Sequence, residues 1–253
     1  MNNAEATPVA VITGSGRGIG RAFALRFARD GYRVVVADLD GANATAVKDE
    51  IVASGGAALA ITMDVSSEAD CERMTTEALR TFGRIDALIN DAAVFADIRR
   101  KPFWEISVEE WDRVMAVNAR GTWLAMKAVV PAMRRQGSGS IINMSSNTFL
   151  AGRPGLLHYV ASKGAVVGIT RVAARELGEF NIRVNCILPG LTQTGVARIS
   201  DDPARHKALL ELQSLKRLEV SDDLVGTAAF LASDDSRFMS GQALTVDGGY
   251  AFH

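Results

Sequence analysis

The chain has 253 residues, of which 48% are hydrophobic, and its net charge is −1 at pH 7. This length and composition predict one α/β domain with a large buried core, and the near-zero charge argues against nucleic acid or an anionic membrane as a partner. Cys71 and Cys186 lie far apart in sequence and are expected to be buried thiols rather than a disulfide.

Several features are missing from the sequence. It has no run of about 18 apolar residues, the length that a membrane span requires, and residues 1–8 lack the apolar core of a signal peptide. No cluster of His, Cys and carboxylate side chains has metal-ligand spacing. We therefore predict a cytoplasmic protein with no membrane span, whose chemistry uses no metal.

The first predicted element is a buried strand at residues 9–13, which runs directly into glycines and then into a helical pattern. A strand, a glycine turn and a helix in this order place backbone N–H groups against phosphate. A purely structural turn is the alternative. We predict that the turn binds a dinucleotide through Gly14, Ser15, Arg17, Gly18, Ile19 and Gly20.

The second predicted strand, residues 33–38, ends in an acid, Asp38, followed by Leu39. An acid about 20 residues beyond the glycines is placed to bond the adenosine ribose. It would also repel a 2′-phosphate, because two unit charges about 4 Å apart interact by about 4 kcal/mol at an effective dielectric near 20. We therefore predict NAD rather than NADP, with Asp38 and Leu39 in contact. A helix N-cap is the alternative role for Asp38. Arg17, a basic residue in the glycine turn, argues in the other direction, because it could bind the 2′-phosphate of NADP.

The rest of the chain continues to alternate between strands and helices, without internal repeats. Further strands are expected at residues 58–64, 86–90, 140–144, 183–188 and 243–246, and long helices at 108–135 and 159–180. This alternation predicts a single-domain, Rossmann-like, doubly wound parallel sheet of about seven strands with helices on both faces. A cofactor would sit at the carboxyl ends of those strands.

Tyr159 and Lys163 are four residues apart, so they share one face of the predicted helix. A phenol has a pKa near 10, and lowering it to about 7 takes roughly 4 kcal/mol. A nearby cation favours the phenolate and so acts in this direction. We predict that Tyr159 is a general base assisted by Lys163, although an ordinary surface pair is also compatible with the spacing.

In this order, the motifs resemble those of the short-chain dehydrogenase/reductase family over nearly the whole chain. The matching features are the glycine turn at 13–20, Asp38, Asp64 with Val65, the stretch Asn90-Asp91-Ala92-Ala93, Asn118, Ser146, Tyr159 with Lys163, Pro189-Gly190 and the stretch 246–249. The family's serine precedes its tyrosine by thirteen positions, which selects Ser146 over Ser145. Residues 146–149 and the C-terminal stretch are similar to NAD-dependent secondary-alcohol and pyridoxal 4-dehydrogenases.

The resemblance implies roles for further residues. Ser146 would stabilise the substrate oxygen, and Asn118 would hold a water that links Lys163 to solvent. Contacts to NAD are implied for Asp64, Val65, Asn90, Ala92, Tyr159, Lys163, Pro189, Gly190, Thr192 and Thr194. The two threonines are alternatively helix caps. Ala93 stands where the family usually has glycine, which changes the local loop.

A small alcohol, ketone or aldehyde is the expected substrate. The residues expected to contact it, with Ser146 and Tyr159, are Phe149, Leu156, His158, Leu191 and Val196. Phe95, Leu150 and Leu157 are further pocket candidates. Residues 191–215 contain a polar break at 201–205 and are predicted to form a flap over the substrate.

We expect an NAD-dependent oxidoreductase that transfers a hydride between NAD(H) and such a substrate. One alternative is an NADPH-dependent carbonyl or 3-oxoacyl-carrier reductase. A non-catalytic dinucleotide sensor and a nucleotide-sugar epimerase are less well matched, because the three reactive residues occur together and the glycine turn differs. The resemblance also implies a homotetramer, or a dimer, paired through the helices predicted at 108–135 and 159–180.

Overall fold

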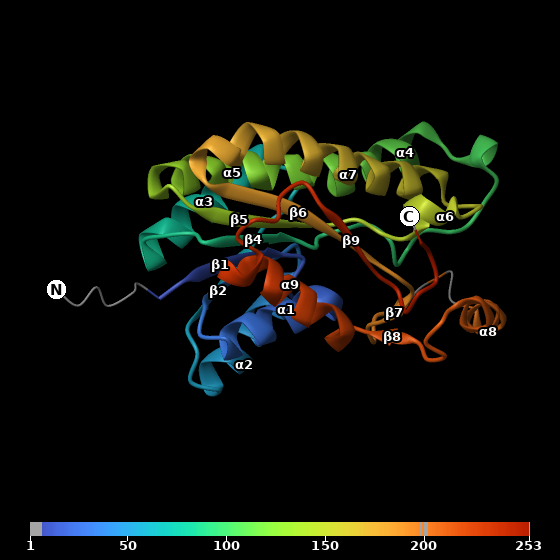
Figure 1. Cartoon of the computed structure of the whole chain (residues 1–253), viewed down its shortest axis with the longest axis horizontal. Coiled ribbons are helices and arrows are strands. Elements are labelled where there is room, and N and C mark those ends of the chain that lie inside the picture. Colours follow the sequence, from blue (N-terminus) through green and yellow to red (C-terminus); the bar gives the residue numbers. More distant parts are fainter. Residues whose placement is uncertain (1–6, 198, 200–201, 253) are drawn as a thin grey trace.

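Within the part of the chain that the computed structural model describes, residues 7–197, 199 and 202–252, seven strands form one parallel sheet in the order β3-β2-β1-β4-β5-β6-β9 (Figure 1). Most of segment 1–8 and Asp201 of the expected polar break lie outside these residues. The strands are β1 Val9–Thr13, β2 Arg33–Asp38, β3 Ala58–Thr62, β4 Ala87–Asn90, β5 Gly139–Met144, β6 Ile182–Pro189 and β9 Ala243–Val246.

Helices cover both faces of this sheet. In Figure 1, α1 (Gly18–Arg29), α2 (Gly41–Ala53) and α9 (Asp222–Ala232) lie on one face, and α3 (Glu68–Phe82), α4 (Val108–Met115), α5 (Thr122–Gln136) and α7 (Leu157–Leu177) lie on the other. The apolar strand residues alternate between these layers. Val9 and Val11 pack in the core beneath α3 and α5, whereas Ala10 and Ile12 pack against α1 and α9. Two covered faces explain why the strands are continuously apolar.

The predicted fold class is confirmed, and the strand boundaries shift by at most two residues. The third strand ends at Thr62 rather than at Asp64, because the segment after it turns toward α3, where Asp64 N–H donates to Asp70 Oδ2 at 2.9 Å. Cys71 and Cys186 are buried free thiols, as expected, and burial raises the pKa of each to about 11. Among the described residues, no helix is both long and apolar enough to span a bilayer.

The helix predicted over residues 108–135 is not one regular helix. It divides into α4, a π-helical turn at Ala116–Gly121, and α5. A capping box between Ser107 and Glu110 starts α4. The second predicted helix ends in a short 3₁₀ turn, Gly178–Phe180, after α7. A π turn inserts an extra residue into the helical ladder, and here it carries Asn118.

Residues 191–215, predicted as a flap, contain regular structure. A two-residue strand, β7 (Thr192–Gln193), pairs in parallel with β8 (Glu219–Val220), and α8 (Pro203–Leu212) follows the gap in the described residues. Asp202 caps α8 by accepting a hydrogen bond from Ala204 N–H at 3.0 Å. Figure 1 shows α8 set apart from the main sheet, near the carboxyl ends of its strands.

The strand order reverses direction between β1 and β4. Chain connections leave these two neighbours toward opposite sides, which opens a crevice at their carboxyl ends, the usual ligand position in this type of sheet. Ala92, just after β4, donates its N–H to Thr13 Oγ1 at the end of β1 at 3.3 Å. The two strand ends are thus joined at the floor of the crevice.

Candidate active site

A cavity of about 830 Å³ occupies this crevice. Its size lies within the range of small-molecule and cofactor sites. Most of the predicted site residues line it, namely Gly14, Arg17, Gly18, Ile19, Asp38, Leu39, Asp64, Val65, Ala92, Ser146, Leu156, Tyr159, Lys163, Pro189, Gly190, Leu191, Thr192, Thr194 and Val196. Glycine turn, strand ends and the start of α7 therefore converge on one space.

The glycine turn leaves no room for side chains at its floor. Gly14 has φ +68°, and a Cβ there would lie 2.7 Å from Ala92 Cα, while a Cβ on Gly20 would lie 2.3 Å from Gly14 O. Helix α1 begins at Gly18, and Arg17 makes no capping hydrogen bond with its side chain. The N–H groups at the very start of α1 are therefore uncapped, while that of Gly20 donates to Asp91, and a helix N-terminus of this kind fits the phosphates of a dinucleotide.

Asp38 lies at the end of β2 on the cavity wall. Its Oδ2 accepts from Gly16 N–H at 2.8 Å, and its Oδ1 accepts from Asp40 N–H at 3.0 Å. The cap of α2 is Asp40, which accepts from Ala42 and Asn43. Asp38 is therefore not the helix N-cap, and its carboxylate is held beside the glycine turn, where a ribose hydroxyl would lie.

Tyr159 and Lys163 lie one turn apart in α7, with the Lys163 Nζ 5.8 Å from the centre of the Tyr159 ring. Lys163 is only 4% exposed and donates to Met144 O at 2.7 Å. Burial lowers the pKa of Lys163 to about 8, and the charge of Asp91 opposes this shift. The geometry places a cation beside a phenol where both side chains are largely buried.

Ser146 follows β5 and faces the same cavity. Its Oγ accepts from Thr148 N–H at 3.2 Å and from the Thr148 hydroxyl at 3.0 Å. With Thr148 as donor, the hydroxyl hydrogen of Ser146 is left to donate into the cavity. Ser145 lines the same cavity, but its hydroxyl donates to Lys163 O at 2.8 Å.

Asn118 stands behind the cavity rather than on its wall. Its Oδ1 accepts from Val94 N–H at 2.7 Å, and its Nδ2 donates to Val94 O at 3.2 Å and to Ser162 Oγ at 3.1 Å. Ser162 in turn donates to Tyr159 O at 2.7 Å. Asn118 therefore ties the loop after β4 to the turn of α7 that carries Tyr159.

Five other residues predicted at the site do not line the cavity. Ser15 is fully buried, donating to Ile12 O and accepting from Ala37 N–H, and the Nδ2 of Asn90 donates to Asn143. Gly20 lies beneath the turn, against Gly14 O.

Two of the predicted substrate contacts, His158 and Phe149, are not part of the cavity wall. His158 is turned about 100° around α7 from its neighbour Tyr159, is 3% exposed, and has its pKa lowered by desolvation. Phe149 is partly exposed and covers Gly164 on α7. Their place in sequence next to reactive residues did not predict the direction of their side chains.

Asp91 is a cavity residue that the sequence analysis did not assign a role. Desolvation raises its pKa to about 7, while the Lys163 charge and a hydrogen bond from the Gly20 backbone oppose the rise. The family pattern usually has asparagine at this position, so the departure itself was the available signal. An acid here adds a titratable group next to Lys163.

The loop at Pro189-Gly190 is fixed by a buried acid, Glu219, on β8. Glu219 accepts from Gly190 N–H at 3.0 Å and from the Thr192 hydroxyl at 2.6 Å. Burial raises the pKa of Glu219 to about 7, and these two hydrogen bonds lower it in part. Thr192 therefore neither caps a helix nor points freely into the cavity.

The far end of the cavity is apolar and basic. The Phe95 and Tyr159 rings lie 4.6 Å apart between centroids with an interplanar angle of 39°, and Leu156 packs in the same cluster. Leu191 and Val196 also line the cavity, but Val196 lies beside Gly18 of the glycine turn. Arg100, Arg113 and Arg153 also line the cavity and were not predicted. Among the described residues, no group of three or more His, Cys, Asp or Glu side chains could hold a metal ion.

Comparisons with known proteins identify the family. The family model described as enoyl-(acyl carrier protein) reductase matches residues 14–251. The 3-oxoacyl-[acyl-carrier-protein] reductase FabG of Staphylococcus epidermidis is 37% identical over 241 residues, 95% of this chain and 97% of that protein. The dehydrogenase/reductase SDR family member 4 of Bos taurus is 36% identical, over 97% of this chain and 88% of that protein.

This chain belongs to the short-chain dehydrogenase/reductase family. It is accordingly an oxidoreductase of that family. A further member that it resembles is the (2S)-[(R)-hydroxy(phenyl)methyl]succinyl-CoA dehydrogenase subunit BbsD of Thauera aromatica, 39% identical over 95% of each chain. A crystal structure of 3-ketoacyl-(acyl-carrier-protein) reductase from Brucella melitensis complexed with NADH superposes with a TM-score of 0.88, at 36% identity over 97% of this chain and 98% of that one.

Proposed function

We propose that this protein interconverts a secondary alcohol and its ketone by exchanging a hydride with NAD(H). One observation carries the proposal: Ser146, Tyr159 and Lys163 converge on the same cavity as the glycine turn at α1 and Asp38. A dinucleotide sensor would need only the last two features. This convergence supports a role for the three side chains in proton transfer beside a bound dinucleotide.

NAD is proposed rather than NADP because of Asp38. Its carboxylate is held by Gly16 and Asp40 N–H groups at the end of β2, and a 2′-phosphate there would meet like charge. The Brucella melitensis relative was crystallised with NADH, which is in keeping with this choice. Bound NAD would supply the hydride acceptor for alcohol oxidation.

The side chains of the chain itself handle the proton. Tyr159 is proposed to take the hydroxyl proton as general base, and the Lys163 cation favours the phenolate form. Ser146 is proposed to donate its hydroxyl hydrogen to the substrate oxygen and to stabilise negative charge there. Asn118 is proposed to act through position, because it fixes the Tyr159 turn to the loop at Val94.

Residues 191–215 are proposed to close over the substrate. Leu191, Thr192, Thr194 and Val196 contribute to the cavity wall from this segment, as do Asp202 at the N-cap of α8 and His206 within it. Glu219 anchors the start of the segment. Closure would exclude water from the reacting atoms.

A second candidate is reduction of a 3-oxoacyl group on a carrier. It is favoured by the names of the relatives, one of which specifies a 3-oxoacyl group on an acyl carrier protein and another a hydroxyl-bearing succinyl group on CoA. Both candidates share the proposed chemistry and differ in substrate size and in cofactor. Turnover of acetoacetyl-CoA with NADH and NADPH, set against turnover of simple secondary alcohols with NAD, separates them.

The deciding experiment follows nicotinamide absorbance with a panel of secondary alcohols, aromatic alcohols, pyridoxal-like compounds and 3-oxoacyl thioesters. We expect NAD(H)-linked turnover. In Tyr159→Phe, kcat should fall by about 10²- to 10⁴-fold, the usual contribution of general acid–base catalysis. NAD binding should stay nearly unchanged in this variant. A Tyr159→Phe protein that keeps most of its rate would exclude Tyr159 as the base, and strong NADP preference would exclude the role given to Asp38.

A further inference from the structure

Three arginines surround the substrate end of the cavity, but two of them are occupied. Arg113 forms an ion pair with Asp97. Arg100 donates from Nη1 to Pro154 O at 3.2 Å. Arg153 lines the same cavity as Tyr159 and Lys163. Its guanidinium contacts an aromatic ring, that of Tyr250, instead of an acid or a carbonyl.

Within the described ranges of the chain, the Arg153 guanidinium meets no carboxylate or carbonyl, and its Nε is buried without a hydrogen-bond partner. An unpaired buried donor is costly, more so when it is charged. The guanidinium is a planar fork of donors that matches the two oxygens of a carboxylate or a phosphate. The guanidinium of Arg153 is therefore available to an anion in the cavity that it lines.

The loop that carries Arg153 is rigidly shaped. Gly152 and Gly155 adopt left-handed conformations, with φ +58° and +79°, and Pro154 lies between them. The Gly155 carbonyl accepts from Lys101 N–H at 3.3 Å, and a Cβ on Gly155 would lie 3.1 Å from Arg100 Cβ. The loop is thus packed against the chain segment that carries Arg100.

The Arg153 side chain is also supported from below. Its Cζ lies 4.9 Å from the centre of the Tyr250 ring, a cation–π geometry. Tyr250 is placed by Asp247, whose carboxylate accepts from Gly249, Tyr250 and Ala251 N–H. The same carboxylate accepts from Asn147 Nδ2 at 3.1 Å, next to Ser146. The position of the cation is therefore coupled to the serine loop.

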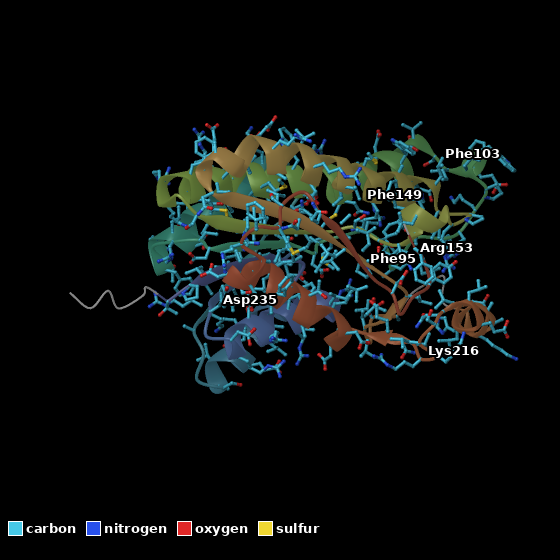
Figure 2. All side chains as sticks on the ribbon, viewed as in Figure 1. Phe95, Phe103, Phe149, Arg153, Lys216 and Asp235 are labelled. Atoms are coloured by element: carbon cyan, nitrogen blue, oxygen red, sulfur yellow. The ribbon has the colours of Figure 1, made fainter. Side chains whose placement is uncertain are left out.

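We infer that Arg153 binds an oxyanion of the substrate, a carboxylate or a phosphate, while the carbon that exchanges hydride lies at Ser146 and Tyr159. The inference rests on the proposed function. The space between the two ends is apolar, with Leu156 and the tilted ring of Phe95. Figure 2 shows Phe95 and Arg153 at the same end of the molecule. The substrate class is an oxo or hydroxy compound with an apolar body and one anionic end.

The test compares matched charged and uncharged substrates in wild type, Arg153→Gln and Arg153→Lys. Acetoacetate is paired with ethyl acetoacetate, and acetoacetyl-CoA with acetoacetyl-pantetheine, so that the carboxylate and the phosphate are tested separately. Removing a hydrogen bond to a charged group should raise KM for one charged substrate by about 10- to 100-fold. The uncharged partner should change little, and lysine should restore part of the loss. The control is Arg99→Gln, an exposed arginine near the same loop but outside the cavity lining.

An equal loss for charged and uncharged substrates, or no loss for either charged substrate, would overturn the inference and leave the proposed hydride transfer intact. A second measurement does not depend on catalysis. Calorimetric titration of the cofactor-free protein with benzoylacetate and with phosphopantetheine should show weaker binding of one of them in Arg153→Gln by a similar factor. If the wild-type protein shows no oxidation or reduction of any substrate, and this difference in binding is nevertheless observed, the proposed function fails and the anion site stands. Equal binding of these ligands by wild type and Arg153→Gln refutes the anion site.

Discussion

At the scale of single residues, the ionisation of Asp91 and Lys163 is mutually dependent. The Asp91 charge raises the pKa of Lys163 against the effect of burial, which brings it to about 8. Desolvation raises the pKa of Asp91 to about 7. Above pH 7 the ionised acid therefore helps to keep the lysine charged.

Asp91→Asn should accordingly move the alkaline limb of the kcat/KM profile to lower pH. Without the acid, the pKa of Lys163 falls further, and the cation is lost earlier as pH rises. Activity near pH 6 should change little, because Asp91 is already protonated there. Asparagine can still accept from the Gly20 backbone, so the variant should fold. The control is Asp112→Asn, exposed on α4; an unchanged alkaline limb would refute the coupling.

Order along the chain predicted several of the residues that line the cavity. Ser146 was selected by its distance from Tyr159, and Asp38 by its place at the end of a strand. Ser15 and His158 could not be placed in this way. The Ser15 hydroxyl satisfies backbone groups of β1 and β2, and the direction of His158 depends on its angle around α7. Arg153 depends on Tyr250, almost a hundred residues further along the chain.

At the scale of elements, continuous apolar runs predicted the central strands of the main sheet, because β1, β4 and β5 are buried on both faces. It did not predict the π turn at Ala116–Gly121 between α4 and α5. The apolar pattern runs through that turn without a break, and the turn coincides with tertiary hydrogen bonds from Asn118 to Val94. The pairing of β7 with β8 was missed for a related reason, since two-residue strands carry no periodicity.

The contact between Glu219 and the loop at Gly190 should depend on pH. The folded-state pKa of Glu219, about 7, lies above its ordinary value of 4.5. The native state therefore holds a proton that the unfolded chain releases between these values, and stability falls as pH rises from about 4.5 to 7. The full pKa difference corresponds to about 3 kcal/mol in the free energy of unfolding, at ~1.36 kcal/mol per pKa unit.

Glu219→Gln should remove this part of the pH dependence. Thermal unfolding of the cofactor-free protein, followed by circular dichroism from pH 4.5 to 7.5, should show a flatter Tm profile than wild type. Glutamine keeps an acceptor for Gly190 N–H, so the loop should survive. Glu176→Gln, exposed on α7, serves as the control. Parallel profiles of wild type and Glu219→Gln would contradict the assignment.

At the scale of the whole molecule, large apolar side chains remain exposed on the layer formed by α4, α5 and α7. They include Trp123, 49% exposed, and Val172, 57% exposed, together with Val108 and Trp111. Contiguous exposed apolar surface often marks an interface between proteins. This is the layer through which the resemblance implies pairing of subunits, so the tetramer or dimer stays a prediction with a defined surface.

Trp123→Glu should shift the protein to a species of about half the wild-type mass or less, because a charge at the centre of an interface is costly. Size-exclusion chromatography with light scattering measures this directly. Val52→Glu, on α2 across the sheet, removes a comparable exposed apolar side chain and should leave the mass unchanged. A monomeric wild type would refute the predicted assembly.

The stack of Arg153 on Tyr250 has a consequence for attempts to redesign the enzyme. Its two members come from distant parts of the chain, and Asp247 connects the second of them to Asn147 beside the serine. Mutant libraries that randomise only the residues nearest the transferred hydride would leave the Arg153–Tyr250 pair unchanged. We expect the variants they yield to keep the same preference for anionic substrates. Mutating positions 153 and 250 together is the more direct way to change the substrate specificity.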